Sequence, residues 1–398
     1  MEYDFDEIVE RRGSRCMKWD TLPDDVLPMW VADMDFAVAP AIQKAVKERA
    51  AHPVFGYTKV EDSYYDAIIN WNHRRHNWDI QRDWILYTTG VVPAISATIK
   101  ALTLPGEKVL IMTPVYNCFF SSIRNQGCLV EETLLKRDDL TYRIDFDDLD
   151  QKCRDEKVTV LLLCNPHNPT GRVWTPEELE RVGEICERNH VIVVSDEIHC
   201  ELVMPGITFT PFAAVNERNA RISVTLDSPS KSFNTAGLQM AHIITQNAEW
   251  RRRIDRVINI YELCDVNPFG PVAVEAAYNE SEDWLDALNR KIADNYNYLK
   301  DFFREELPQA IVMKLEGTYL AWVDIMSFEL TSDEAAKILQ EEGKVKIISG
   351  TAYGRKAGQG FIRINLACPK PLLKEGLIRI ARTLSQYCVE EENPGCPA

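Results

Sequence analysis

The residues with the clearest chemical potential lie in the segment 227–238, a predicted polar loop that follows a predicted strand over 221–226. In this segment Lys231 comes directly after Ser230, with Ser228 three residues before it. A lysine amine can form a Schiff base with an aldehyde cofactor, and adjacent hydroxyls can bind that cofactor's phosphate. A lysine between serines is also often a solvated surface residue. The segment therefore suggests pyridoxal phosphate (PLP), provided that the chain also supplies an acid, a stacking aromatic ring, phosphate-binding amides and an arginine for a carboxylate.

Two further segments offer an anion site and an acid. Gly90 separates a predicted strand over 84–89 from a helix with Pro93 in its first turn, and free N–H groups at a helix start bind anions. An ordinary strand–helix turn explains that pattern equally well, because it is neither a GxGxxG nor a Walker loop. Asp196 follows a predicted apolar strand over 191–194. A buried carboxylate is costly unless it is paired, and a protonated ring nitrogen is a suitable partner.

Two more polar or aromatic side chains follow predicted buried strands. Tyr116 comes just after the strand 108–113, at the end where ligand sites form in α/β proteins, and its ring could stack on a planar ligand. Asn168 lies in the turn-rich segment 165–171, after the most apolar strand, 158–164. Its amide could donate to a phenolic oxygen, although the segment could equally serve just to end the strand.

The elements that position these residues follow an α/β pattern. Strands alternate with helices from residue 84 to about 260, which is typical of a parallel sheet. One helix is marked by Pro176 and by a Thr175–Glu178 capping box. A long helix over 284–306 leads to an α+β region, with strands at 320–325 and 360–366 and helices at 332–342 and 370–387. The predicted divisions are 1–48 (N-terminal arm and part of a small domain), 49–288 (large domain), 289–390 (small domain) and 391–398 (disordered tail).

Net charge, cysteine content and the lengths of apolar runs limit the classes of protein to which the chain can belong. A net charge of −16 argues against nucleic acid or an anionic membrane as a partner. Eleven cysteines without a C-x-x-C pair fit reduced thiols in a cytoplasm better than disulfides or a structural metal site. The charged N-terminus has no apolar stretch typical of a secretory signal, and no apolar run approaches the roughly 20 residues needed to span a bilayer. We therefore expect a cytoplasmic protein without a metal.

Taken together, three segments resemble the fold-type I, aspartate aminotransferase-like PLP enzymes: residues 165–171 (NPHNPTG), Ser195-Asp196, and residues 228–231 (SPSK). Residues 29–36 (MWVADMDF), 195–199 (SDEIH), 230–238 (SKSFNTAGL) and 363–369 (RINLACP) are most similar to the cystathionine β-lyase or C–S lyase branch, the MalY/PatB type. The resemblance covers nearly the whole chain. It implies a large PLP-binding domain with a mostly parallel mixed sheet between helices, and a smaller α+β domain formed by the N-terminal segment and the C-terminal third.

The resemblance also implies roles for individual residues. Lys231 would hold PLP and act as the base at the substrate Cα, Asp196 would keep the ring nitrogen protonated, and Tyr116 would stack on the ring, so these three are the predicted catalytic residues. Further predicted cofactor contacts are the amides of Val91 and Val92, Asn168 at the 3-oxygen, His199, Ser228, Ser230 and, from the other subunit of a homodimer with shared active sites, Tyr57. Arg363 would bind the substrate α-carboxylate in bidentate fashion, with Asn168 and the backbone of Ala32 nearby.

Two departures separate the chain from many transaminases. His199 stands where many have a tyrosine, and Gln239 stands where many have a phosphate-binding arginine. Both fit the lyase branch. The predicted activity is therefore β-elimination from L-cystathionine or related S-substituted cysteines, giving a thiol, pyruvate and ammonia. An aminotransferase of class I/II is the alternative. A regulatory or ligand-binding protein on the same scaffold is a third possibility, which a missing cofactor residue would favour.

Overall fold

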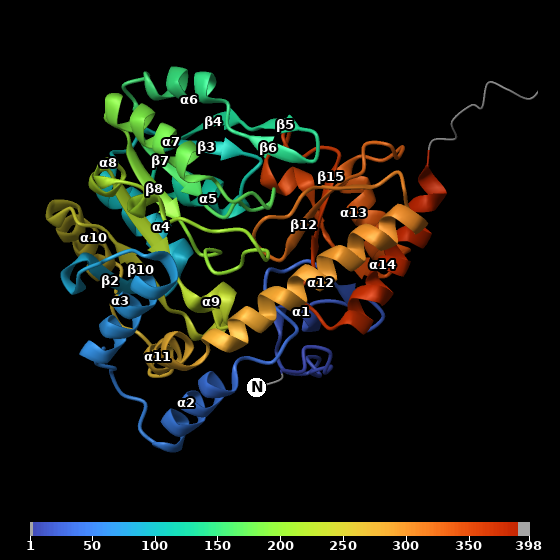
Figure 1. Cartoon of the computed structure of the whole chain (residues 1–398), viewed down its shortest axis with the longest axis horizontal. Helices are drawn as coiled ribbons and strands as arrows, with labels where there is room; N and C mark the ends of the chain where they lie inside the picture. The colour runs from blue at the N-terminus through green and yellow to red at the C-terminus, as the bar shows by residue number, and fades with distance from the viewer. Residues whose placement is uncertain (1–2, 389–398) are drawn as a thin grey trace, which may run out of the picture.

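A seven-stranded sheet forms the centre of the computed structural model, which describes residues 3–388 (Figure 1). The strand order is β2-β10-β9-β8-β7-β3-β4; the neighbours from β9 to β4 are parallel, and β10 is antiparallel to both β2 and β9. The strands are β2 (Ile85–Thr88), β3 (Lys108–Thr113), β4 (Leu129–Leu134), β7 (Val158–Cys164), β8 (Ile192–Asp196), β9 (Ser223–Asp227) and β10 (Ala241–Ile244).

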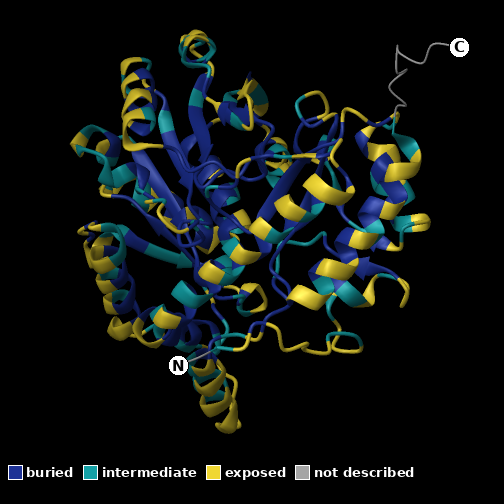
Figure 2. Ribbon diagram, turned by 45° about the vertical axis from the view of Figure 1, so that its right-hand side comes forward, coloured by how far each residue is buried: buried dark blue, intermediate teal, exposed yellow. Residues whose placement is uncertain are grey.

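Helices cover both faces of this sheet, and alternate side chains of each strand enter different cores. In β7, Leu162 belongs to the core that includes residues of α4 (Val91–Leu102), α5 (Asn117–Asn125) and α10 (Ala248–Ile260). Leu161 belongs to the core that includes residues of α6 (Phe146–Cys153) and α7 (Pro176–Arg188). Burial of each such side chain stabilises the fold by roughly 1.5–3 kcal/mol. This two-sided burial explains why β7 is apolar without a break, and Figure 2 shows the strands buried beneath helices with exposed outer faces.

A second, antiparallel sheet forms the C-terminal part, in the order β11-β12-β15-β14. Its strands are β11 (Ile311–Val312), β12 (Leu320–Asp324), β14 (Ile348–Ser349) and β15 (Phe361–Asn365), and its helices are α12 (Glu282–Glu306), α13 (Ser332–Glu341) and α14 (Lys370–Leu384). The N-terminal segment joins this part, because β1 (Leu27–Pro28) pairs in parallel with β13 (Val345–Lys346). The predicted fold class is therefore confirmed.

The remaining elements are short or lie at the periphery. They are α1 (Met17–Asp20), α2 (Pro40–Ala51), α3 (Asp62–His76), β5 (Lys136–Asp138), β6 (Thr141–Arg143), α8 (Glu217–Arg221), α9 (Pro229–Ser232), α11 (Gly270–Glu280), and the 3-10 turns η1 (Arg82–Trp84), η2 (Phe212–Ala214), η3 (Ala236–Leu238), η4 (Gly350–Tyr353) and η5 (Ser385–Tyr387). Within residues 3–388, no helix has both the length and the apolar content that a bilayer span requires.

Several boundaries differ from the predicted ones. The predicted strand over 221–226 begins at Ser223, because Arg221 ends α8, and Trp84 belongs to η1 rather than to a strand. The predicted polar loop around Lys231 is instead the short helix α9, which Ser228 caps by accepting a hydrogen bond from the backbone N–H of Ser230 at 3.0 Å. The boundary predicted at 288/289 lies inside the continuous α12, so the division stays a prediction, and the tail at 391–398 lies outside the described residues.

Candidate active site

A cavity lies where β7, β8 and β9 end and where α4 begins. It encloses about 800 Å³ of space, part of which is open to solvent. Eight of the predicted site residues line it: Ala32, Val91, Val92, Tyr116, Asp196, His199, Ser230 and Lys231. Carboxyl ends of neighbouring parallel strands meet at one edge of a sheet, and this edge is where ligands bind in open α/β folds. The predicted chemistry is therefore gathered at one place.

Lys231 projects from α9 into this cavity. Its Nζ atom donates a hydrogen bond to the carbonyl oxygen of Ala32 at 2.6 Å. The pKa of Lys231 is lowered to about 8, chiefly by loss of surrounding water and also by Arg363, while Asp33 and Asp196 oppose the shift. A substantial share of the amine is therefore neutral near physiological pH, as a nucleophile or general base requires.

Asp196, the last residue of β8, is buried on the wall of the cavity. Its Oδ1 accepts a hydrogen bond from the backbone N–H of Ile198 at 3.2 Å. The pKa of Asp196 is raised to about 7, chiefly by burial and also by the nearby Asp227, whereas the N–H of Ile198 and Lys231 oppose the shift. A ligand that places a protonated ring nitrogen beside this carboxylate would offset its desolvation.

His199 and Tyr116 add a neutral imidazole and a ring to the same cavity. Burial lowers the pKa of His199 to about 3, so the imidazole is uncharged, and its Nδ1 has no hydrogen-bond partner among residues 3–388. A buried ring nitrogen without a partner is costly unless a ligand satisfies it. Tyr116 is half-buried at the start of α5, where burial raises the pKa of its phenol. Both side chains therefore face a cavity that suits a polar planar ligand.

The start of α4 provides an anion site. Gly90 has φ +154°, and no side chain caps the helix, so the N–H groups of its first turn remain for a ligand. Val91 is buried and Val92 is partly exposed, and both line the cavity together with Ser230. These groups fit a phosphate.

Arg363, in β15, lies beside this site with one nitrogen unpaired. Its Nη1 donates to Asn168 Oδ1 at 3.3 Å and its Nη2 to the carbonyl oxygen of Trp30 at 2.7 Å. Its Nε is buried and has no partner among the described residues, and the guanidinium stacks over Tyr353, 5.0 Å from the ring centre. A planar fork with a donor to spare is what bidentate binding of a carboxylate uses.

Besides Arg363, three further predicted contacts lie outside the cavity lining. The hydroxyl of Ser228 is buried and donates to the carbonyl oxygen of Met240 at 2.6 Å, while it also caps α9. Asn168 is buried behind the lining and reaches the site through Arg363. Tyr57 is 96% exposed, outside the cavity. The roles assigned to these three residues stay predictions, as do those of the predicted residues that line the cavity.

Sequence reasoning missed some residues of the site. Tyr319 donates its hydroxyl to the carbonyl oxygen of Ala32 at 2.9 Å and packs edge-to-face against His199. Cys164 and Met240 also line the cavity. Cys164 ends β7, so its position at the carboxyl end of a buried strand was a usable signal. No sequence pattern marks Tyr319 as a site residue, because only the tertiary packing of the C-terminal part brings it to the cavity.

Comparisons with known proteins agree with this geometry. The family model for aminotransferase class I and II matches residues 24–380. The cystathionine β-lyase PatB of Bacillus subtilis is 41% identical over 386 residues, which cover 96% of this chain and 100% of PatB. A PLP-bound putative aminotransferase from Clostridium difficile superposes with a TM-score of 0.94 at 38% identity, covering 96% of this chain and all of that one. A PLP-bound C–S lyase from Staphylococcus hominis gives a TM-score of 0.90 at 34% identity, covering 96% and 98%.

Proposed function

The chain belongs to the aminotransferase class I and II family, and we propose that within it the protein is a PLP-dependent carbon–sulfur β-lyase. It cleaves L-cystathionine or a related S-substituted cysteine to a thiol, pyruvate and ammonia. The observation that carries this function is the 41% identity with the cystathionine β-lyase PatB over that protein's full length. The cavity around Lys231 supports the same function, because its groups fit the cofactor.

Residues of the cavity are suited to hold PLP. Lys231 would bind it covalently through its amine, the first turn of α4 and Ser230 would bind its phosphate, and Asp196 would keep the proton on its ring nitrogen. His199 Nδ1 would gain a polar partner there, since it has none within residues 3–388. When bound, PLP supplies an electron sink for negative charge that develops at the substrate Cα.

The chain's own groups then account for elimination. Arg363 binds the substrate carboxylate and orients the Cα–H bond toward Lys231. The substrate amine would displace Lys231 from the cofactor, and the freed, neutral Lys231 amine takes the Cα proton. The bond between Cβ and sulfur breaks, so that the sulfur leaves with its electron pair as a thiolate. The remaining three-carbon fragment takes up water and ends as pyruvate and ammonia. A depressed pKa at Lys231 favours this proton transfer near neutral pH.

An assay of product formation distinguishes this function from that of an aminotransferase. The alternative is weighed because the matching family model and the similar Clostridium difficile structure both carry the name aminotransferase. The holoenzyme is incubated with L-cystathionine or L-cystine without any keto acid. Equal amounts of pyruvate and thiol from L-cystathionine, or of pyruvate and persulfide from L-cystine, released over many turnovers, support the lyase. Conversion that stops after one equivalent and resumes only when a keto acid is added would mean an aminotransferase instead.

We also propose a homodimer in which Tyr57 reaches the cofactor phosphate of the partner. The exposure of Val54 (62%), Phe55 (57%) and Tyr57 (96%) supports it, because a run of exposed apolar side chains marks an interaction surface.

A cytoplasmic location is supported by the ten cysteines within residues 3–388, which are all free thiols. The division at 48/49 and 288/289 into a large and a small domain remains part of the proposal.

A further inference from the structure

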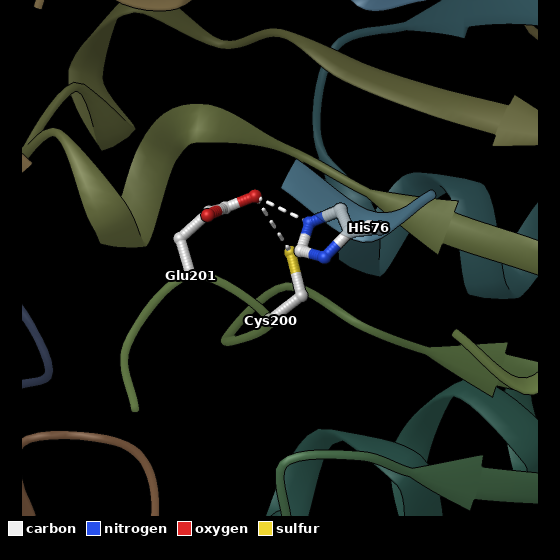
Figure 3. A group of neighbouring side chains, drawn as sticks. All are labelled: His76, Cys200 and Glu201. Atoms are coloured by element: carbon white, nitrogen blue, oxygen red, sulfur yellow. Dashed lines mark hydrogen bonds and ion pairs between the residues drawn. The ribbon is translucent and has the colours of Figure 1, made fainter. Parts of the chain in front are cut away.

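A buried polar cluster lies next to the active site but does not line its cavity. It consists of His76, at the end of α3, and of Cys200 and Glu201, which follow β8 (Figure 3). The Glu201 Oε1 accepts hydrogen bonds from His76 Nε2 at 2.6 Å and from Trp71 Nε1 at 2.6 Å. Arg75 adds a guanidinium whose Nε lies 3.5 Å from Glu201 Oε2. The proposed reaction uses none of these groups.

A metal site is the first interpretation to weigh, since the ligand atoms of His76, Cys200 and Glu201 all lie within 4.8 Å of one another. Three features argue against it. The negative charge of Glu201 is already balanced by His76 and Arg75, and the Arg75 guanidinium would repel a divalent cation placed beside it. Burial raises the pKa of the Cys200 thiol, so the thiolate that a metal needs is disfavoured. The set also holds three protein ligands rather than the four of a structural zinc site.

The cluster connects instead to the turn that carries Lys231. The Cys200 thiol lies 3.6 Å from Asp227 Oδ1 and 3.9 Å from Glu201 Oε1, so it bridges the two carboxylates. Asp227 Oδ1 in turn accepts the backbone N–H of Ser228 at 2.6 Å. Ser228 caps the helix on which Lys231 stands. A continuous chain of contacts therefore runs from α3 to the residue that would hold the cofactor.

We propose that His76, Cys200 and Glu201 form, together with Asp227, a positioning network that fixes the Lys231 turn in its cofactor-binding geometry. The inference rests on the proposed function, because it takes Lys231 as the attachment site. The four residues act through Ser228 and not on the substrate, since none of them lines the cavity.

The charge state of Asp227 controls the strength of its hydrogen bond with the Ser228 N–H, and so how firmly the network fixes the Lys231 turn. The pKa of Asp227 is raised to about 6, chiefly by burial and also by Glu201, whereas the N–H of Ser228, His76 and the thiol of Cys200 oppose the shift. The other titratable groups that interact with Asp227 are Asp196, Glu197, Tyr64 and Tyr278. An ionised carboxylate is the stronger acceptor for the Ser228 N–H. The turn should therefore hold cofactor well above pH 6 and lose it as the pH falls through about 6.

Two substitutions should move this midpoint in opposite directions, which mere damage to the fold would not do. Glu201→Gln removes a negative charge near Asp227, so the pH at which half the cofactor absorbance is lost should fall by about one unit. His76→Gln removes a positive charge, so the midpoint should rise by about as much. The matched controls are Glu282→Gln, which also pairs with Arg75, and the exposed His73→Gln on the same helix. Both controls should leave the midpoint unchanged.

Cofactor absorbance is followed against pH for each variant, alongside thermal unfolding of the cofactor-free protein. Should Glu201→Gln or His76→Gln not fold, Cys200→Ala and Cys200→Ser replace them; the alanine should raise the midpoint, because it removes a donor to Asp227, and the serine should not. Midpoints that stay in place, or that move in the same direction in both charge variants, would overturn the network. If the wild-type protein takes up no PLP at any pH, the proposed function fails rather than the network.

Discussion

The Nζ of Lys231 donates a hydrogen bond, at 2.6 Å, to the carbonyl oxygen of Ala32, a residue 199 positions earlier in the chain. The same oxygen accepts the hydroxyl of Tyr319 at 2.9 Å, so the N-terminal arm, the large sheet and the C-terminal part meet at one atom. The arm segment is fixed there by Asn365, whose Nδ2 donates to the carbonyls of Val31 at 2.6 Å and Asp33 at 2.7 Å. The arm therefore forms one wall of the active site and couples it to the smaller sheet.

Replacing Lys231 by alanine should abolish turnover. The substitution removes both the covalent attachment point and the base at Cα, and the loss of a general base alone costs about a hundred- to ten-thousandfold in rate. The measurement is pyruvate release from L-cystathionine under saturating substrate. Lys59→Ala is the control, because Lys59 is an exposed lysine outside the site, and it should retain wild-type activity. Near-normal turnover by the Lys231 variant would remove that residue from the mechanism.

Asp196→Asn should weaken catalysis while it stabilises the cofactor-free protein. The amide cannot keep a ring nitrogen protonated, so kcat should fall by a factor of about a hundred or more. Ser195→Ala, which alters a neighbouring side chain bonded to Glu197, is the control for local disturbance. A kcat that falls equally in both variants would show that the carboxylate has no special role.

The pH dependence of stability follows from the same carboxylate. The folded-state pKa of Asp196 is raised to about 7 from 3.8, so below the lower value the group is protonated in both states and costs nothing. As the pH rises from about 4 to about 7 the unfolded chain loses the proton first, and the cofactor-free protein is destabilised by on the order of a few kcal/mol. Asp196→Asn should therefore be the more stable variant at pH 8 and of similar stability at pH 4. Denaturant unfolding at the two pH values measures this, and an equal difference at both would contradict it.

Arg363→Lys should raise KM for the amino-acid substrate and lower kcat/KM by roughly a hundredfold, because a lysine keeps the charge but lacks the planar fork. Uptake of PLP, followed by absorbance, should be little affected. Arg304→Lys, at an exposed position on α12, serves as the matched control. If Arg363→Lys leaves KM unchanged, another group must bind the carboxylate.

Tyr57→Phe should weaken cofactor binding without altering the fold. Tyr57 is 96% exposed within one chain, so loss of its hydroxyl should change the free energy of unfolding by less than about 0.5 kcal/mol. If it binds the partner's phosphate, the dissociation constant for PLP should rise about tenfold, the typical effect of a lost hydrogen bond to a charged group. Tyr261→Phe, at another exposed tyrosine, is the control. Equal PLP affinity in both variants would argue against a shared site.

Much of the large sheet could be predicted from the sequence because its strands are buried on both faces. The strands over 108–113 and 158–164 have the predicted limits, and the Thr175 capping box starts α7 as expected. The prediction around Lys231 was wrong. The serine-rich composition suggested a loop, whereas Ser228 caps a short helix that begins at Pro229. The elements α5, α6 and β4 were missed, since they are short and partly exposed.

The active site was predictable to the extent that its residues follow strand ends. Asp196 and Tyr116 lie there, and the topology of a parallel sheet brings such positions together. The hydrogen bond from the Tyr319 hydroxyl to the carbonyl oxygen of Ala32 could not be predicted, because it depends on how the arm and the C-terminal part pack against the sheet. The network of His76, Cys200 and Glu201 depends on the same kind of tertiary packing.

Reductive trapping shows directly whether Lys231 carries the cofactor. The holoprotein is reduced with borohydride, digested with trypsin and analysed by mass spectrometry. We expect a stable pyridoxyl phosphate adduct on Lys231, in a peptide that begins after Arg221 and is not cleaved at the modified lysine. An adduct on another lysine, or none in protein that has been saturated with PLP, would contradict it.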